Sequence, residues 1–257
     1  MKRKSYAKVN IFLKIAGKRA NYHELVSRFV RVENLYDTME FQRGNFNDFT
    51  LDGDFGCETK KNTIYKGYLA LCQISSKVEE FFKSHKVLVE KNIPEFAGLG
   101  GGSSNCAVFI LMVNKYCNLG LSTKELSEIG AKIGADVPFF IYDTVSANVT
   151  GIGEVVEPFE EEPLNIETFT PKIACNTGAI FTSFREKFYK EVTREEAKKL
   201  LSMKSIDILN EYDINRANDL YAPALDNYAD LKPENFNLPR NSFFSGSGSS
   251  FFYLKEK

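Results

Sequence analysis

Apolar and polar residues alternate along the first part of the chain. Residues 5–15 follow this two-residue period, are rich in strand-forming side chains and stop at a glycine and two basic residues at 17–19. A half-buried strand followed by a turn is typical of this pattern. The same reasoning predicts further strands at residues 26–32, 37–41, 87–91 and 172–175. The polar, glycine-containing segment 43–63 is expected to interrupt them as a loop.

Elsewhere apolar residues recur three and four positions apart, which is the spacing of an amphipathic helix. This spacing predicts helices at residues 62–83, 180–190 and 194–203, and another that the glycine-rich loop before Val108 opens. Ser122 and Glu125 form a capping-box pattern for one more helix, which is expected to end at residues 130–134. Asp136 then lies in a non-helical turn.

Two glycine-bearing turns occur later in the chain. Residues 141–158 are expected to form a hairpin, and residues 245–249 a turn between strands rich in phenylalanine. The acidic segment 160–163 has the composition of a solvated connection, at which a domain could end. His85 stands in a polar stretch with no motif around it, so we expect an ordinary surface residue.

The charge of the chain is nearly balanced. Its 257 residues include 33 basic and 34 acidic ones, with a formal net charge of -1, so no overall field attracts nucleic acid or an anionic membrane. Asn10 and Lys14 interrupt the apolar run near the N-terminus, and no segment reaches the roughly 20 apolar residues of a spanning helix. We therefore expect a soluble protein with no nucleic acid or membrane partner, and no obligate protein partner is evident.

The cysteines point to a reducing compartment. Their number is odd, and none of them is spaced as Cys-x-x-Cys, so neither a disulfide framework nor a zinc site is supported. They are Cys57, Cys72, Cys106, Cys117 and Cys175. Reduced thiols in the cytoplasm fit this pattern best.

The strongest chemical signal is the glycine-rich segment from Gly98 to Asn105, which stands at the start of a predicted helix. Glycine lets the backbone approach a ligand closely, and a helix N-terminus offers unpaired N–H donors and a partial positive charge. Phosphate is the natural ligand of such a cradle. A flexible linker is the alternative, but a linker would not lead directly into a well-patterned helix.

Two common nucleotide motifs do not fit this segment. No lysine follows the glycines, as a Walker loop requires, and Ser103 stands where a Rossmann fingerprint has its third glycine. A less common phosphate loop remains.

Four motifs in the same order resemble those of the GHMP small-molecule kinases. They are residues 7–13 with Lys8 and Asn10, the loop at 98–105, residues 134–138 around Asp136, and residues 245–248. The resemblance covers nearly the whole chain. It implies an α+β fold of two lobes with the active site in the cleft between them. The N-terminal domain, with the phosphate loop, would span residues 1–155 and the C-terminal domain residues 156–257.

The first motif, followed by residues 17–19 and 22–25, is similar to members of the family that act on a cytidine diphosphate sugar alcohol. The implied reaction is transfer of the γ-phosphate of ATP to a hydroxyl of this small molecule, in the non-mevalonate route to isoprenoid precursors. Positioning and positive charge matter most in such a transfer. The resemblance gives Lys8 and Asp136 the catalytic roles. Asp136 would either accept the hydroxyl proton or mainly orient the hydroxyl.

The resemblance also implies the binding residues. ATP would bind along Glu95, Phe96, Ala97, Gly98, Leu99, Gly100, Gly101, Gly102, Ser103, Ser104 and Asn105. Cytosine would stack between Tyr22 and Phe181, with a hydrogen bond from His23, while Asn10 and Thr177 complete the substrate site. Where the family usually has Asp-Gly before the tyrosine, this chain has Asn21 alone, so the turn is expected to be shorter.

Magnesium is expected with ATP, although no paired carboxylates identify its ligands, and Ser104 is the candidate hydroxyl. Two other functions stay open. A different GHMP kinase, acting on homoserine, mevalonate or a sugar, would keep the loop but would not need Tyr22, His23 and Phe181. A nucleotide-binding protein without turnover would bind ATP and release no ADP.

Overall fold

Two long strands dominate the N-terminal part of the chain. β1 spans Lys2–Arg19, β2 spans Tyr22–Arg43, and the two strands pair. The computed structural model describes residues 1–19 and 22–255. Asn21 lies outside the described residues, so the shortened turn stays a prediction. The two strands predicted at 26–32 and 37–41 are both part of β2, because no glycine or proline interrupts the extended backbone between them.

The described chain divides into two compact units. Unit 1 consists of Met1–Ala7, Leu35–Glu95 and Gly100–Asp143, and unit 2 of Lys8–Asn34, Phe96–Leu99 and Thr144–Lys257. Both long strands contribute to both units. The units are therefore discontinuous in sequence and differ from a division into residues 1–155 and 156–257, which stays a prediction about the family's domains.

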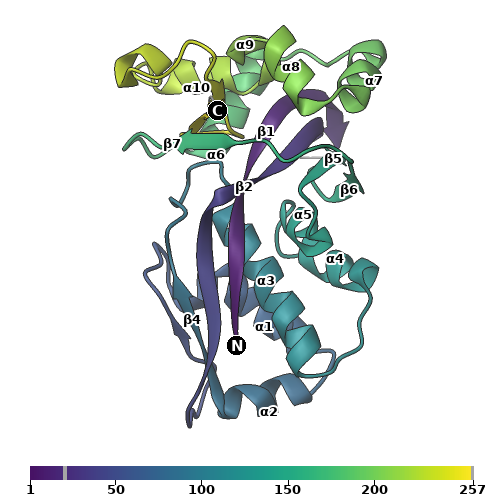
Figure 1. The fold of residues 1–257 in the computed structure, drawn as a ribbon, viewed down its shortest axis with the longest axis vertical. Coiled ribbons are helices and arrows are strands. Elements are labelled where there is room, and N and C mark those ends of the chain that lie inside the picture. Colours follow the sequence, from purple (N-terminus) through teal and green to yellow (C-terminus); the bar gives the residue numbers. More distant parts are fainter. Residues whose placement is uncertain (20–21, 256–257) are drawn as a thin grey trace. The chain divides into compact units, whose positions relative to one another are not determined.

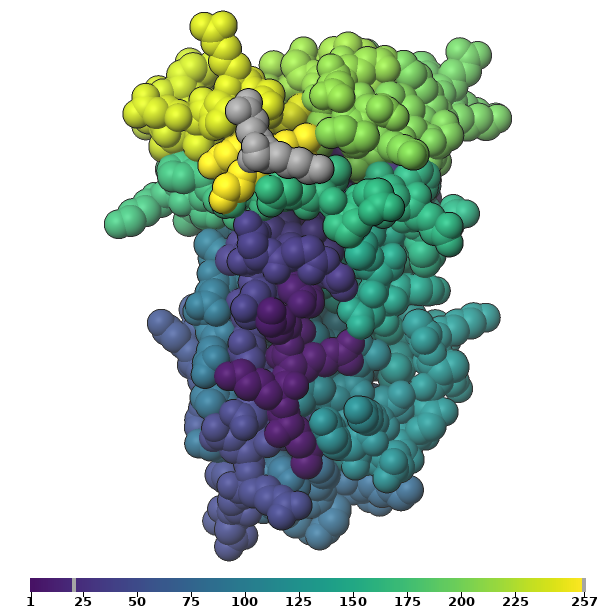
Figure 2. All heavy atoms as spheres, viewed as in Figure 1, coloured from purple at the N-terminus to yellow at the C-terminus, as the bar shows by residue number. Residues whose placement is uncertain are grey.

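Unit 1 combines strands with a group of helices (Figure 1). Its elements are β3 (Leu51–Asp52), a 3-10 turn (Thr59–Lys61), α1 (Thr63–Cys72), α2 (Lys77–Lys83), β4 (His85–Glu90), α3 (Gly101–Tyr116), α4 (Thr123–Ala131) and α5 (Val137–Tyr142). β4 pairs antiparallel with the second half of β2 and parallel with β3. In Figure 2 the first residues of β1, in dark purple, lie at the surface of this unit.

Aromatic side chains fill the core of unit 1. Phe41 of β2, Phe82 of α2 and Phe109 of α3 are buried against one another, with ring centroids 5.4 to 6.0 Å apart. α3 carries the longest run of buried residues among these helices and contacts both α1 and α5. This packing holds the N-terminus of α3 in place.

Two predictions in unit 1 need correction. The helix predicted over 62–83 is two helices, because Ser75 accepts a hydrogen bond from the amide of Lys77 and starts a second helix. His85 is buried, not an ordinary surface residue: its ring stacks on Phe81 with centroids 4.0 Å apart. By contrast, the capping box of Ser122 and Glu125 is confirmed.

Unit 2 contains a hairpin and a small separate sheet. Its elements are β5 (Ser146–Thr150), β6 (Val155–Pro158), β7 (Ile166–Phe169), α6 (Thr177–Ser183), a π-helical turn (Phe184–Phe188), α7 (Arg194–Ser202), α8 (Ser205–Glu211), α9 (Ile214–Ala217), α10 (Tyr221–Asn227), a 3-10 turn (Pro233–Phe236), β8 (Phe243–Phe244) and β9 (Phe251–Leu254). The first half of β2 pairs antiparallel with β5, and β5 pairs with β6. β9 lies between β7 and β8 in the three-stranded sheet.

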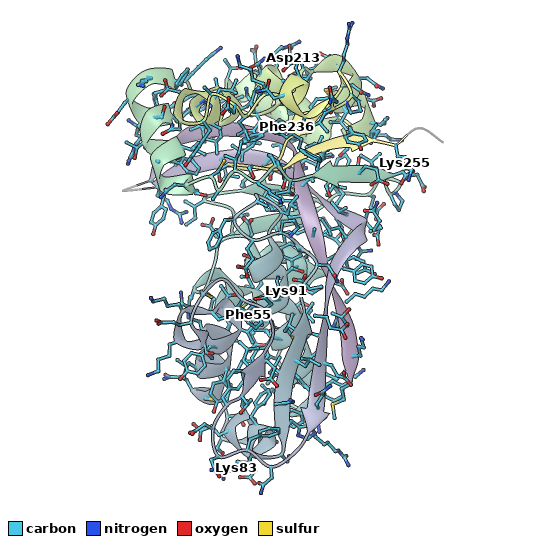
Figure 3. The ribbon with its side chains drawn as sticks, turned by 90° about the vertical axis from the view of Figure 1, so that its left-hand side faces the viewer. Phe55, Lys83, Lys91, Asp213, Phe236 and Lys255 are labelled. Atoms are coloured by element: carbon cyan, nitrogen blue, oxygen red, sulfur yellow. The ribbon has the colours of Figure 1, made fainter. Side chains whose placement is uncertain are left out.

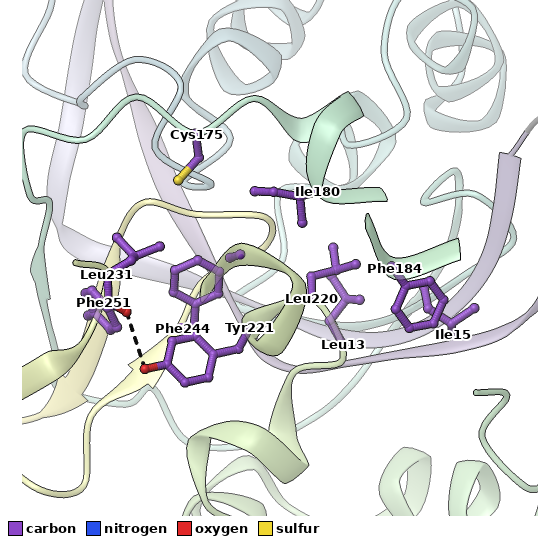
Figure 4. Packing of buried hydrophobic residues seen from close by; sticks show 11 residues of the cluster. Leu13, Ile15, Cys175, Ile180, Phe184, Leu220, Tyr221, Leu231, Phe244 and Phe251 are labelled. Carbon is purple, nitrogen blue, oxygen red and sulfur yellow. Dashed lines mark hydrogen bonds between the residues drawn. The ribbon is translucent and has the colours of Figure 1, made fainter. Parts of the chain in front are cut away.

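Residues distant in sequence form the core of unit 2 (Figure 4). Leu13 and Ile15 of β1 belong to the same buried cluster as Ile180 of α6 and Phe244 of β8. The hydroxyl of Tyr221, also in this cluster, donates a hydrogen bond to the carbonyl of Leu231. The core therefore ties β1 to the C-terminal helices.

One predicted strand is absent from unit 2. Residues 172–175 are irregular, and the strand of this region is β7, which ends before Pro171. Proline has no amide hydrogen for a sheet, and the amide of Ile173 donates to the carbonyl of Pro171 in a tight turn. The predicted hairpin is confirmed as β5–β6, although α5 occupies its first residues.

Candidate active site

The glycine-rich segment opens a helix, as predicted. Gly98 and Gly100 have φ angles of 75° and 71°, a backbone conformation that favours glycine, and α3 begins at Gly101. The N-terminus of this 16-residue helix follows the glycine-rich turn directly. Its first amides have no acceptor within the helix and carry a partial positive charge. An anion is the ligand that such a terminus stabilises.

The first turn of α3 has one open side. A Cβ atom added to Gly101 would lie 2.9 Å from a side-chain carbon of Ile93, so this glycine faces the interior. Gly102 is exposed, and a Cβ atom there would meet only the hydroxyl of Thr63, at 3.7 Å. That hydroxyl donates to the carbonyl of Gly102. The surface at Gly102 is therefore free to receive a ligand close to the backbone.

Ser103 and Ser104 differ in exposure. Ser103 is half-buried, and its hydroxyl lies 3.6 Å from the position that a Cβ atom on Gly134 would take. Ser104 is buried and its hydroxyl accepts a hydrogen bond from Ser5. The hydroxyl suggested for a metal ion is thus occupied inside unit 1. Among the described residues there is no group of three or more His, Cys, Asp or Glu arranged to hold a metal ion.

Asp136 stands in the turn before α5 in unit 1, as predicted. The amide of Val137 donates to the carbonyl of Gly134, which closes this turn. Asp136 is half-buried. The turn therefore keeps a carboxylate within two residues of the glycine that faces Ser103.

Lys8 is buried, with only 3% of its surface exposed, although a lysine on an alternating strand commonly faces solvent. Its ammonium group donates to the side-chain oxygen of Asn10 (2.8 Å) and to the carbonyl of Gly98 (3.0 Å). It also lies 4.6 Å from the ring centroid of Phe29. The side-chain amide of Asn10 donates in turn to the hydroxyl of Ser27. Unit 2 thus brings together Lys8, Asn10 and the first glycine of the loop.

The second glycine turn packs on the same glycine. The hydroxyl of Ser245 donates to the carbonyl of Gly98 at 3.0 Å. A Cβ atom added to Gly98 would lie 2.2 Å from the carbonyl oxygen of Ser245, far too close for any side chain. The side-chain amide of Asn218 donates to the backbone carbonyls of Phe244 and Gly246, and these two hydrogen bonds hold this turn in place.

The remaining loop residues differ in burial. Ala97 and Leu99 are buried, whereas Phe96 is 71% exposed and has a positive φ of 54°. Glu95 accepts a hydrogen bond from the amide of Gly56.

An aromatic cluster in unit 2 contains two of the predicted cytosine residues, His23 and Phe181. The rings of His23 and Phe181 stack with centroids 5.3 Å apart, and Phe184 packs edge-on against His23. Tyr22 is 63% exposed. Thr177, at the start of α6, shares a hydrogen bond with Ser247 of the second glycine turn. The ring of Tyr22 is therefore exposed to solvent, whereas the neighbouring His23 is buried.

His23 is poised to accept or donate a hydrogen bond. Its Nε2 atom is buried and has no hydrogen-bond partner among the described residues. Burial, together with the positive charges of Arg185 and Lys18, lowers the pKa of His23 below its ordinary value of 6.5. This lowered pKa favours the neutral ring, in which one nitrogen is a donor and the other an acceptor.

Known proteins resemble this chain over nearly its whole length. The model of the GHMP kinases N terminal domain matches residues 62–144, which include the start of α3. A 4-diphosphocytidyl-2-C-methyl-D-erythritol kinase from Sulfurimonas denitrificans is 50% identical over 260 residues, which cover 99% of this chain and 97% of that protein. The chain belongs to the GHMP kinase family, in the group of these kinases.

Two further relatives agree. A 4-diphosphocytidyl-2-C-methyl-D-erythritol kinase from Sulfurovum is 46% identical over 98% of each chain. The crystal structure of a 4-(cytidine 5'-diphospho)-2C-methyl-D-erythritol kinase superposes with a TM-score of 0.77 at 28% identity, covering 100% of this chain and 90% of that one. The predicted α+β fold of the GHMP kinases is confirmed.

Several residues that support the family's motifs were not predicted from the sequence. Ser27, Phe29 and Asn218 hold Lys8, Asn10 and the second glycine turn, yet each stands in an unremarkable stretch. Residues 26–30 of β2 are all buried, on both faces of the strand, so the only available signal was that Ser27 and Phe29 stand within a predicted strand. Asn218 gives no such signal, because its contacts connect segments far apart in the chain.

In the part of the chain that the structure describes, no helix combines the length and apolar character needed to cross a membrane. The five cysteines are all free thiols.

Proposed function

We propose that this chain transfers the γ-phosphate of ATP to the 2-hydroxyl of 4-diphosphocytidyl-2-C-methyl-D-erythritol, a step in non-mevalonate isoprenoid precursor synthesis. The observation that carries the proposal is the near-full-length similarity, at 50% identity, to a kinase that bears this substrate's name. The helix N-terminus behind a glycine turn and the aromatic cluster around His23 are the two binding features that such a reaction needs.

ATP is the co-substrate, and its phosphates are proposed to bind at the N-terminus of α3. The exposed backbone at Gly102 supports this placement, because only the hydroxyl of Thr63 lies near it and a phosphate oxygen can approach its amide. We propose that magnesium arrives bound to the ATP phosphates. Ser104 is buried in a hydrogen bond, and no carboxylate cluster replaces it among the described residues.

The transfer forms a bond between the acceptor oxygen and the γ-phosphorus and breaks the bond to the oxygen that leaves with ADP. Lys8 is proposed to stabilise the charge on the transferred group, and Asn10 to orient Lys8 through their 2.8 Å hydrogen bond. Asp136 is proposed to hold the acceptor hydroxyl and to take its proton. In a loose transition state the proton moves late, as the bond to the leaving oxygen breaks.

The cytidine half of the substrate is proposed to bind at the aromatic cluster. Tyr22 is exposed and can stack on the cytosine ring, with Phe181 on the other side and Thr177 nearby. Phe181 is partly buried, stacks on His23 and packs against the core cluster of unit 2, so only its exposed part remains for the base. The lowered pKa of His23 favours its neutral ring, and its Nε2 atom, which has no partner among the described residues, is proposed to pair with a base edge when binding uncovers it.

Three wider proposals accompany this function. The family's two domains divide near residue 155, the enzyme works in the cytoplasm, and it needs no nucleic acid or protein partner. The free state of all five cysteines agrees with a reducing compartment.

The test is ADP release, coupled to a detection enzyme, with MgATP and 4-diphosphocytidyl-2-C-methyl-D-erythritol. The matched control is the same diol without its cytidyl group. Turnover with the cytidylated substrate alone is the expected result. Turnover with mevalonate or homoserine instead would indicate another GHMP kinase, and tight ATP binding without ADP release would indicate a binding protein.

A further inference from the structure

A buried carboxylate in unit 1 lies at the centre of a hydrogen-bond network. Asp37, on β2, has no exposed surface. Its Oδ1 atom accepts from the backbone amides of Asn92 (2.7 Å) and Ile93 (2.8 Å), and its Oδ2 atom accepts from the side-chain amide of Asn105 (2.9 Å) and pairs with Lys91. Both oxygens are therefore fully engaged.

The partners of Asp37 stand at both ends of the glycine-rich segment. Asn92 and Ile93 precede that segment, and Asn105 is its last residue, in the second turn of α3. The ammonium group of Lys91, a residue labelled in Figure 3, donates to Asn105 as well, at 3.0 Å. One carboxylate thus connects the entrance of the loop to its exit.

The network continues into the helix N-terminus. Asn105 donates to the hydroxyl of Ser5, which donates to the hydroxyl of Ser104. Lys91 lies 3.7 Å from the position of a Cβ atom on Gly101, so a positive charge stands beside the first turn of α3. Asp37 balances this charge. Without it, a nearly buried ammonium group would remain unpaired, at a substantial free-energy cost.

We propose that Asp37 is a positioning residue for the phosphate loop, acting through Lys91, Asn105 and the amides of Asn92 and Ile93. It sets the distance between the two ends of the loop, and so the direction of the amides that receive ATP. The inference rests on the proposed function, because it takes the loop as the ATP site. A purely structural ion pair would stabilise unit 1 without selectively affecting ATP.

Asp37→Asn is expected to break the link between the two ends of the network. The amide oxygen can still accept from Asn92 and Ile93, but its NH₂ group faces the donors of Lys91 and Asn105, so the link to α3 is lost. The loss of one charge-assisted hydrogen bond corresponds to about a 10- to 100-fold change in an equilibrium. We expect the KM for ATP to rise by about this factor, and the KM for the cytidylated substrate to stay unchanged.

The matched control breaks a buried ion pair elsewhere. Arg28 and Glu161 of unit 2 are also buried, with a nitrogen to oxygen distance of 3.6 Å. Glu161→Gln should lower the melting temperature and leave the KM for ATP at the wild-type value. An equal rise in the KM for ATP in both variants would overturn the proposal, because instability alone would then explain the effect.

Amide hydrogen exchange gives a readout that does not need turnover. In Asp37→Asn the peptides that span residues 92–105 should exchange about tenfold faster or more, and in Glu161→Gln they should not. Unchanged exchange in Asp37→Asn would overturn the inference even if the protein proved to have no kinase activity. Failure of the proposed function alone would appear as no ADP release by the wild type.

A milder variant covers the case in which Asp37→Asn does not fold. Ser5→Ala keeps all bonds of Asp37 and removes only the link from Asn105 to Ser104. It should raise the KM for ATP about 3- to 10-fold, as expected for one neutral hydrogen bond. An unchanged KM together with unchanged exchange of residues 92–105 would count against the proposed network.

Discussion

Gly98→Ala is the sharpest test of the loop geometry. The new Cβ atom would lie 2.2 Å from the carbonyl oxygen of Ser245 and 3.2 Å from the amide nitrogen of Gly248. Ordinary contacts between such atoms need more than 3 Å, so the loop and the second glycine turn must separate by about 1 Å. The φ of 75° adds about 1 kcal/mol of strain for a residue with a side chain.

This separation would also weaken the two hydrogen bonds that end at the carbonyl of Gly98, from Ser245 and from Lys8. A misplacement of about 1 Å costs on the order of 100-fold in rate, so kcat/KM should fall by about that factor. Steady-state kinetics with both substrates and a thermal melt measure the two effects separately.

Gly120→Ala is the matched control. Gly120 has a similar φ of 70°, but nothing lies within 4 Å of an added Cβ atom. This variant should lose about 1 kcal/mol of stability and keep its kcat/KM. If Gly98→Ala lost no more activity than Gly120→Ala, the contact between the two glycine turns would not matter for catalysis.

Three further predictions concern the proposed site. Asp136→Asn should bind both substrates but lose about 100-fold or more in kcat, and near-normal kcat would remove Asp136 from the mechanism. Tyr22→Ala should weaken the cytidylated substrate by about 1–3 kcal/mol and spare ATP, since this exposed ring supports little of the fold; equal losses for both substrates would indicate misfolding. Because burial and the charges of Arg185 and Lys18 lower the pKa of His23, the unfolded chain binds a proton that the folded chain does not. The melting temperature should therefore fall as the pH decreases below about 6.5, and it should fall less in His23→Gln. Thermal melts between about pH 5 and 8 measure this dependence. An equal fall in the wild type and in His23→Gln would contradict the role of His23.

Local sequence signals predicted the elements that depend on near neighbours. The capping box of Ser122 and Glu125 and the helix after the glycine-rich segment are both present, because their hydrogen bonds connect residues within a turn or two. The predicted strand at 172–175 failed for the opposite reason. β7 gains its partner from β9, more than 80 residues further along the chain, and no local pattern contains that pairing.

The same difference applies to the site. Contiguous motifs predicted the loop, Lys8 and the turn around Asp136 as candidates. They did not show that Lys8 is buried. Lys8 occupies a polar position in a strand of alternating polar and apolar residues, where a side chain commonly faces solvent. His85 was missed although a signal existed: it shares the inward face of β4 with Val87 and Val89, two and four residues on.

The second glycine turn supports the glycine-rich segment 98–105. The amide of Ser250 donates to the carbonyl of Ala97, and the hydroxyl of Ser245 donates to that of Gly98. Gly246 approaches so closely that a Cβ atom there would lie 3.3 Å from the Gly98 carbonyl. Gly98 therefore requires glycine because of the second turn, a side chain at Gly246 would press tightly on Gly98, and the two Asn218 hydrogen bonds hold the second turn in position. Two glycine motifs that look independent in the sequence thus act as one support for the loop backbone.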